Sequence, residues 1–266
     1  MKIGCIPLCF GQQIKRDKTM TVEDWIAMAV ELGLDATEMY EPYIKDRNDD
    51  ERRKLSDLVY DSGLVVSMFT PESNFSNPDE RDEEVARTKG YIDSAKIFNT
   101  KIVRITAASH TLVGEVSIQR GPKRDAAMES VAAGMKLCLD YAEDNGVSLA
   151  LEDHPALGTN VDDFTRMIDM IDDDRLKVNL DTANVKDTTT VELTERVKNR
   201  VVHTHCSELL NNEHGHVIGR GNVDFKGVFG VLKSAGYDDW ISLEQLHGNK
   251  EDLAFSIEYI RGIWNS

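Results

Sequence analysis

The sequence from residue 148 to residue 184 reads SLALEDHPALGTNVDDFTRMIDMIDDDRLKVNLDTAN and contains two short apolar runs on either side of an amphipathic stretch. The runs Ser148–Glu152 and Lys177–Asp181 have the length and apolar character of buried β-strands. Between them, Val161–Ile171 carries apolar residues at the spacing of one helical face. A strand, a helix and a second strand in this order predict a parallel sheet covered by helices.

The same alternation extends in both directions and fills the chain. Capping residues and glycines mark several helix ends; Thr21, for example, opens TVEDWIAMAVELG, which closes on Gly33. With the two runs above, the predicted strands are Lys2–Pro7, Ala36–Met39, Leu64–Phe69, Lys101–Thr106, Ser148–Glu152, Lys177–Asp181, Val201–His205 and Trp240–Glu244. The predicted helices are Thr21–Leu32, Asp49–Ser62, Asp79–Ile97, Arg124–Asp144, Val161–Ile171, Val191–Val197, Phe225–Ala235 and Asn249–Ile263.

Eight strand–helix repeats in 266 residues predict an α/β fold, a (β/α)₈ TIM barrel whose single domain occupies residues 1–266. At this length a closed barrel is more economical than an open doubly wound sheet. The first strand is not followed by G-x-G-x-x-G, which disfavours a dinucleotide-binding sheet. The sequence also has no Gly/Ser/Pro-rich linker that would divide it into two domains.

The composition restricts the partners that this chain can have. Its formal net charge of −16 disfavours nucleic acid and anionic membrane surfaces, because binding to either needs a basic surface. No stretch approaches the ~18 consecutive apolar residues of a membrane span, and the start MKIGCIPLCF lacks the features of a signal peptide. We therefore expect a cytoplasmic protein with reduced thiols, since no C-x-x-C spacing relates its cysteines, Cys5, Cys9, Cys138 and Cys206.

Polar side chains end four consecutive predicted strands: Glu152, Asp181, His205 and Glu244. The active site of an α/β barrel lies at the carboxyl ends of its strands, so these four side chains are expected to converge in the barrel mouth. Three carboxylates placed together repel one another unless a proton or a cation intervenes. Three carboxylates and one imidazole suit a single divalent ion such as Mn²⁺, Mg²⁺, Co²⁺ or Zn²⁺.

Each of the four residues also has a purely structural interpretation. Asp181 could cap the following helix, Glu152 or Glu244 could pair with a buried arginine, and His205 could be a core histidine with satisfied hydrogen bonds. These interpretations are reasonable for each residue taken singly. The occurrence of four such endings on successive strands favours a metal site.

The motifs of strands five to eight resemble those of the xylose-isomerase-like sugar isomerase/epimerase family of TIM barrels, which also includes enzymes of the AP endonuclease 2 type. The similar segments lie within residues 148–244 and read LEDHP, LKVNLDTAN, HTHCSE, GRGNVDF and SLE. The resemblance implies a metal held by Glu152, Asp181, His205 and Glu244. It also implies that Glu152 and Glu244 act as acid and base on opposite faces of a sugar, one removing a proton beside a carbonyl and the other returning it.

Four further residues are candidates for contact with the substrate. Asn184 stands where epimerases of the family often carry a histidine; it can hydrogen-bond a hydroxyl but cannot exchange a proton near neutral pH. His154 follows Glu152 by two positions and is expected in the same mouth, either as a substrate contact or as an orienting residue. Glu38 closes the second strand, and Arg220 lies in the GRGN turn, where each could instead be a surface charge or a loop ion pair.

The connection Cys206–Asp224 is long for a β/α loop, and we expect it to cover the substrate. Its histidines, His214 and His216, offer the alternative of a second metal site. The loop histidines His110 and His247 are expected to be solvated.

Several functions fit these residues. The first is a metal-dependent isomerase or epimerase acting on a ketose or a polyol-derived keto compound, a small carbohydrate-like substrate. The second is a dehydratase of inosose or dehydroshikimate type, a lyase in which proton abstraction precedes loss of water. An endonuclease-IV-like repair enzyme is disfavoured by the negative charge, and because the third and fourth strands end without a histidine. A non-catalytic sugar-binding barrel is a fourth possibility, and relatives suggest a homo-oligomer.

Overall fold

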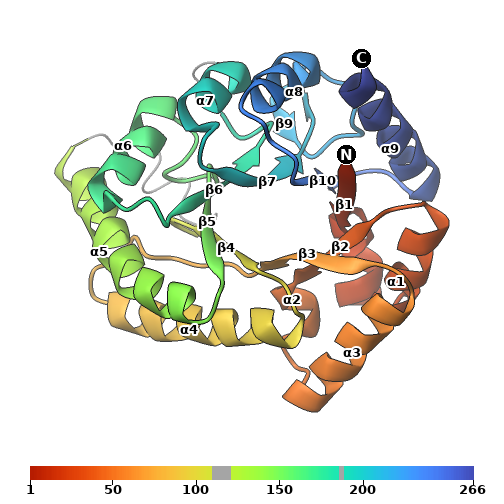
Figure 1. Ribbon diagram of the computed structural model, residues 1–266, viewed down its shortest axis with the longest axis horizontal. Coiled ribbons are helices and arrows are strands. Elements are labelled where there is room, and N and C mark those ends of the chain that lie inside the picture. The colour runs from red at the N-terminus through yellow and green to blue at the C-terminus, as the bar shows by residue number, and fades with distance from the viewer. Residues whose placement is uncertain (110–120, 186–188) are drawn as a thin grey trace.

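Eight parallel strands form a ring around a central axis in the computed structural model, which describes residues 1–109, 121–185 and 189–266 (Figure 1). The order in the sheet is β1-β10-β7-β6-β5-β4-β3-β2, so each barrel strand lies beside its neighbours in sequence. At the seam, the amide of Asp35 donates to the carbonyl of Ile3 at 2.9 Å. The strands are β1 Lys2–Ile6, β2 Ala36–Tyr40, β3 Val65–Thr70, β4 Ile102–Thr106, β5 Ser148–Glu152, β6 Lys177–Asp181, β7 Val201–Cys206 and β10 Trp240–Glu244. The predicted TIM barrel is confirmed.

Helices surround the ring on its outer side (Figure 1). They are α1 Val22–Glu31, α2 Glu41–Ile44, α3 Asp49–Asp61, α4 Arg81–Ile97, α5 Pro122–Asp144, α6 Val161–Ile171, α7 Thr190–Val197, α8 Phe225–Ser234 and α9 Lys250–Asn265. The bounds agree with the predicted helices to within two residues. Three short helical segments follow the first two strands without having been predicted, namely α2, a 3₁₀ turn at Leu8–Phe10 and a π-helical turn at Gln12–Asp17. Each is too short to show a helical period in the sequence.

Local side-chain hydrogen bonds explain where the helices begin. Thr21, Asn48 and Asn249 each cap a helix in a capping box, in which the cap side chain accepts from the third helical amide and that residue's carboxylate accepts from the cap amide. α1 ends before Gly33, whose φ of +68° lies in the left-handed region that favours glycine. These signals are local, which is why they were visible in the sequence.

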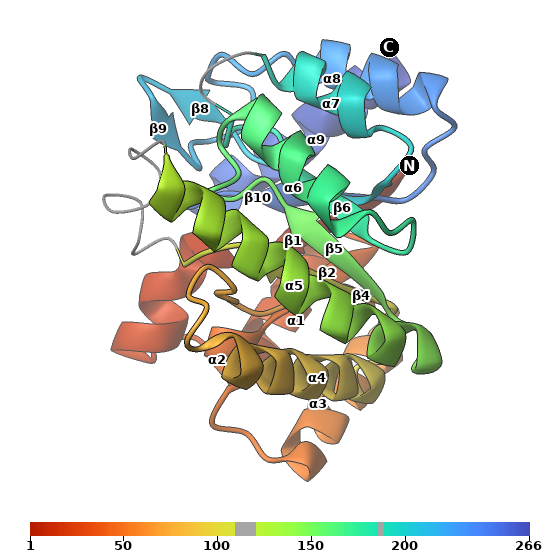
Figure 2. The same ribbon diagram turned by 90° about the vertical axis from the view of Figure 1, so that its left-hand side faces the viewer.

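The connection after β7 contains a small hairpin, formed by the antiparallel strands β8 (Leu209–Leu210) and β9 (Glu213–His214). Figure 2 shows this hairpin projecting from one end of the barrel. The four cysteines are buried free thiols, as expected. Within the described ranges, no helix is long and apolar enough to cross a bilayer.

Strand register brings the strand ends to a common level. Asp181 of β6 is paired with His205 of β7, and Thr106 of β4 is paired with Glu152 of β5. On the other side of β10, Glu244 is paired with Ile6 of β1. The carboxyl ends of the strands therefore meet at one mouth, which is where an α/β barrel places its site.

Candidate metal centre

The four polar strand ends meet in the barrel mouth. Glu152, Asp181, His205 and Glu244 each offer one ligand atom, and these four atoms all lie within 4.8 Å of one another. All four residues are buried, with at most 8% of their surface exposed. The predicted convergence of these side chains is therefore present. Three oxygens and one nitrogen form a compact set of lone-pair donors.

His205 lies at the centre of this cluster. Its Nδ1 is 2.7 Å from Glu152 Oε1 and 2.8 Å from Glu244 Oε2, while its Nε2 is 3.1 Å from Glu38 Oε2. Burial alone would lower the pKa of His205, but the surrounding carboxylates outweigh burial and raise the pKa well above its ordinary value. The carboxylates of Glu152 and Glu244 thus favour a cation, either a proton or a metal ion, next to Nδ1 of His205.

Asp181 is held by its own loop and by the hairpin after β7. Its Oδ1 accepts the amide of Ala183 at 2.7 Å, and its Oδ2 accepts the hydroxyl of Ser207 at 2.8 Å. His214 Nε2 lies 3.2 Å from Asp181 Oδ2. Burial would lower the pKa of His214, but Asp181 raises it to about 9. The hairpin therefore places a cationic histidine over the cluster; the sequence had identified His214 only as part of a covering loop or a second metal site.

Arg104 of β4 was not among the predicted site residues. Its Nη1 donates to Glu152 Oε2 at 3.1 Å, and its Nε and Nη2 donate to the carbonyl of Pro71 at 3.1 and 2.9 Å. Burial would raise the pKa of Glu152, but Arg104 and then His205 lower it to about 2. An arginine within the apolar run KIVRIT was a signal that a buried anion lies beside the fourth strand, because a buried charge needs a partner.

Glu152 consequently shows both of the features weighed in the sequence. It pairs with a buried arginine through Oε2, and it joins the four-residue cluster through Oε1. Asn179 Nδ2 also donates to Oε1 at 3.3 Å. The two interpretations therefore coexist on two different oxygens of one carboxylate.

The predicted substrate contacts are distributed unequally around the mouth. Glu38 is 2% exposed, and its carboxylate accepts from Thr70 Oγ1 at 2.6 Å, from His205 and from Ser242. The structure therefore places Glu38 inside the barrel beneath the cluster, with both oxygens engaged by protein groups. Arg220 lies elsewhere: it pairs with Asp252 at 3.0 Å, with over half of its side chain exposed.

His154 and Asn184 lie beyond the ends of β5 and β6. Burial lowers the pKa of His154, and the carboxylates of Glu152, Glu244 and Asp181 oppose that effect, which places the ring in the field of the cluster. Asn184 is buried, three residues after Asp181. Both positions border the mouth, and a substrate role for either stays a prediction.

Glu208 organises the long connection that was expected to cover the substrate. Its buried carboxylate accepts the amides of Leu209 at 3.1 Å, Gly219 at 2.9 Å and Val223 at 2.9 Å. A Cβ on Gly221 would come within 2.5 Å of this carboxylate, so the close approach requires glycine there. The glutamate of HTHCSE thereby ties together two parts of the connection that carries His214.

The remaining loop histidines lie outside this network. His216 packs against His247 with ring centroids 5.0 Å apart, and its Nε2 lies 3.2 Å from Glu213. Among the described residues, the groups that could hold a metal include none of His214, His216 and His247. The second metal site considered for His214 and His216 is therefore not formed there. His110 lies outside the described residues.

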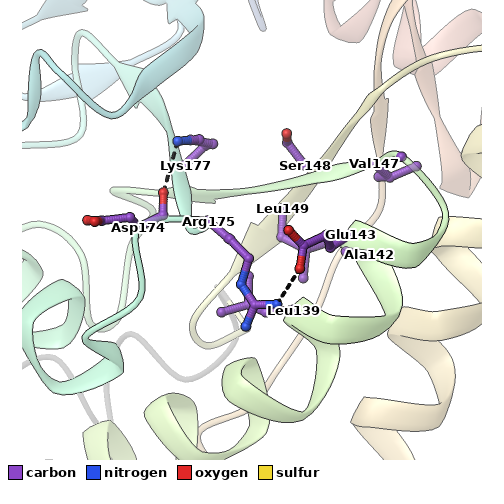
Figure 3. A pocket seen from close by; sticks show the side chains of 10 residues that line it. Leu139, Ala142, Glu143, Val147, Ser148, Leu149, Asp174, Arg175 and Lys177 are labelled. Atoms are coloured by element: carbon purple, nitrogen blue, oxygen red, sulfur yellow. Dashed lines mark hydrogen bonds and ion pairs between the residues drawn. The ribbon is translucent and has the colours of Figure 1, made fainter.

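A pocket of about 370 Å³ opens at the opposite end of the barrel, where β5 and β6 begin (Figure 3). Figure 3 shows Arg175 directed toward Glu143, and Lys177 bonded to the carbonyl of Asp174. Arg175 also pairs with Asp140 and Asp173. Because the amino-terminal face of such barrels serves stability, we assign these ion pairs to the scaffold.

Known proteins with this fold include sugar-converting enzymes. An inosose dehydratase of Lacticaseibacillus casei is 23% identical over 252 residues, which cover 85% of this chain and 83% of that protein. A further curated relative is 29% identical over 132 residues, which are 44% of its own length. The D-psicose 3-epimerase of Clostridium cellulolyticum H10 superposes with a TM-score of 0.81 at 16% identity, over 99% of both chains.

A zinc-binding protein shares the fold as well. The structure described as IOLI protein with a bound zinc atom superposes with a TM-score of 0.75 at 17% identity, over 99% of this chain and 96% of that one. At these identities the superpositions establish the fold. The family model of the xylose isomerase-like TIM barrel matches residues 26–263, nearly the whole chain. This match, together with the barrel, shows that the chain belongs to the xylose isomerase-like TIM barrel family.

Proposed function

We propose that this protein is a metal-dependent enzyme that isomerises or epimerises a ketose or a polyol-derived keto compound. The observation that carries the proposal is the buried cluster of Glu152, Asp181, His205 and Glu244, whose ligand atoms lie within 4.8 Å of one another. Buried carboxylates at this spacing repel strongly without a cation between them.

The residues present fit a single divalent ion. Three carboxylate oxygens and one imidazole nitrogen are ligands that Mn²⁺, Mg²⁺, Co²⁺ and Zn²⁺ accept, so the donor set is compatible with all four ions. The zinc-bound protein of the same fold supports this proposal. Glu152, Asp181, His205 and Glu244 would hold the ion, and other groups would support them.

The chemistry follows from the two glutamates. A divalent ion, when bound, polarises a carbonyl and its adjoining hydroxyl and so stabilises the negative charge that develops as the neighbouring proton leaves. Glu152 and Glu244 approach His205 from β5 and β10, so they can serve two faces of one substrate. One carboxylate takes the proton and the other returns it. Arg104 holds Glu152 Oε2, which leaves Oε1 directed at the cluster.

Substrate recognition in this proposal uses the polar groups that border the mouth. His154 and Asn184 follow β5 and β6, and we propose that they bind hydroxyls of a small carbohydrate-like substrate. The position of His214 over Asp181 gives the site a further donor. Arg220 would reach a substrate only after leaving Asp252.

Dehydration is the second candidate function, and two observations favour it. An inosose dehydratase aligns with 85% of this chain, and loss of a hydroxyl requires a proton donor at the leaving oxygen. His214, held as a cation by Asp181, could supply that proton. The first step, removal of a proton beside a carbonyl, is the same in both reactions.

Metal content tests the proposal first. Wild type, Glu152→Gln and Asp181→Ala are purified without chelator and equilibrated in one metal-supplemented buffer. We expect about one equivalent of metal in wild type, largely lost in Asp181→Ala, because that change deletes a ligand. Glu152→Gln retains the volume and an oxygen, so it keeps more metal but loses proton transfer. Wild type that binds no supplied ion would leave the proposal without its basis.

Product analysis in deuterated water then separates the two candidate reactions. An isomerase or epimerase acting on a panel of ketoses and inososes gives a product with the substrate's composition that carries solvent deuterium at the reacting carbon. A dehydratase gives a product that has lost water. Glu152→Gln and Glu244→Gln should each abolish isomerisation or epimerisation, since each removes one of the two proton-carrying groups of that reaction.

A further inference from the structure

Glu38, one of the predicted substrate contacts, lies directly against His205 of the metal cluster inside the barrel. Its two oxygens accept from three side chains on three strands: Thr70 of β3, His205 of β7 and Ser242 of β10. It is 2% exposed, beneath the four-residue cluster. A substrate entering from the mouth would have to displace these protein donors to reach it.

Glu38 offers an acceptor to the ring nitrogen of His205 that faces away from Glu152 and Glu244. A neutral imidazole has one N–H, and an ionised carboxylate only accepts. Both nitrogens of His205 face carboxylates, and Nε2 lies 3.1 Å from Glu38 Oε2. With an ion in the four-residue cluster, Nδ1 has to offer its lone pair, and the one proton of the neutral ring stays on Nε2, facing Glu38. The lone pair of Nδ1 then points between Glu152 Oε1 and Glu244 Oε2, at 2.7 and 2.8 Å.

The neighbouring histidine of β7, His203, does not donate a proton to Glu38. Asn179 donates its amide N–H to Glu152, so its carbonyl oxygen accepts the Nδ1 proton of His203 at 2.8 Å. Neutral His203 therefore has no proton on Nε2, which faces Ser67 at 3.4 Å and Glu38 at 3.8 Å. His205 is left as the imidazole that donates to Glu38.

We propose that Glu38 is a positioning residue for the metal centre, which keeps His205 in the Nε2–H form and so presents Nδ1 to the ion. The inference rests on the proposed function, since it assumes a metal held by the four-residue cluster. A carboxylate on the far nitrogen of a ligating histidine fixes the ring orientation and strengthens the ligand, and loss of such a partner typically lowers metal affinity about 10- to 100-fold. Thr70 and Ser242 hold the carboxylate in place.

The test compares Zn²⁺ affinity in wild type, Glu38→Gln and Thr70→Val. Affinity is measured by competition titration at increasing pH until it no longer changes, so that proton competition at His205 does not contribute. Glu38→Gln, which can turn its amide N–H₂ toward Nε2, should lose about 10- to 100-fold in affinity. Thr70→Val removes a hydrogen bond to the same carboxylate without touching the imidazole, and should lose much less.

Imidazole ¹⁵N spectra of zinc-loaded wild type give a second readout that needs no variant. We expect a protonated Nε2 and a zinc-bound Nδ1 on His205. The reverse arrangement would overturn the role of Glu38, and so would equal affinities in wild type and Glu38→Gln, or equal losses in Glu38→Gln and Thr70→Val. Wild type that binds no Zn²⁺ would overturn both this inference and the proposed function, whereas the other outcomes leave the metal site standing.

Discussion

The two halves of the barrel contribute different kinds of side chain to the same mouth. Strands β5, β6, β7 and β10 carry the four residues of the candidate metal centre at or next to their carboxyl ends. Strands β2, β3 and β4 contribute Glu38, Thr70 and Arg104, whose polar atoms contact protein groups rather than the open mouth. The carboxyl-terminal half therefore supplies the side chains that could bind a metal ion, and side chains of the amino-terminal half hydrogen-bond to two of them, Glu152 and His205.

The difference teaches how a charged site can be built in a packed core. A carboxylate that must bind an ion has to keep one oxygen available, and repulsion among several such groups opposes folding. Arg104 reduces that cost by pairing with the second oxygen of Glu152, and Glu38 engages the second nitrogen of His205. Replacing Arg104 should therefore act mainly on the stability of the metal-free protein, whereas replacing one of the four cluster residues should act mainly on metal binding.

The largest expected effect is on stability, from Arg104→Met. Removing the arginine leaves Glu152 as a buried charge without its main cation, and such losses cost roughly 3–5 kcal/mol. The free energy of unfolding of the metal-free protein, measured by urea denaturation, should fall by that amount. Adding Glu152→Gln to Arg104→Met should recover more than half of the loss, because the buried charge is then absent.

Glu244→Gln is the matched control from the other half of the barrel. Glu244 has no arginine partner among its recorded contacts, which are His205 and Ser207. Its replacement removes a partner of His205 but also relieves repulsion among the cluster carboxylates, so it should change the stability of the metal-free protein much less than Arg104→Met does. Equal losses of stability in Arg104→Met and Glu244→Gln would abolish the distinction between the two halves.

The next effect is the pH dependence of metal binding. The pKa of His205 is raised well above its ordinary value by Glu38, Glu244 and Glu152, acting against burial. Near pH 7 the metal-free ring is therefore protonated, and an ion must displace that proton. Affinity should rise about tenfold per pH unit until the pH exceeds this pKa, with about one proton released per ion.

Calorimetry in two buffers of different ionisation enthalpy measures the released proton directly. The same experiment on His214→Gln provides a control, since His214 contacts Asp181 but is not one of the four cluster residues. We expect that variant to release a similar number of protons. Metal binding without proton release in wild type would mean that His205 is not a ligand.

The smallest effect is expected for Arg220→Ala. This side chain pairs with Asp252 at the surface and lies over the ring of Phe255, at 5.0 Å from its centroid. An exposed ion pair contributes about 0–1 kcal/mol, so stability and metal content should hardly change. Once an active substrate is found, an unchanged KM would place Arg220 outside the site, and a raised KM would support its predicted role in binding substrate.

The position of the candidate site could be predicted from the periodicity of apolar residues in the sequence. Eight apolar runs with helical stretches between them predict the barrel, and the location of active sites at the carboxyl ends of barrel strands predicts that Glu152, Asp181, His205 and Glu244 lie together. The same rule could not say which way a side chain turns after its strand ends. Arg220 lies in a family-like turn, yet it faces Asp252 rather than the cluster.

What the sequence by itself determined was therefore the order of strands and helices, their caps and the four strand ends that meet, because these depend on residues close together along the chain. Only the tertiary structure decided that Arg104 pairs with Glu152, 48 residues away, and that Glu38 supports His205, 167 residues away. Such contacts depend on register and on the competition of several groups for each hydrogen-bonding atom. That competition arises only when the strands lie side by side.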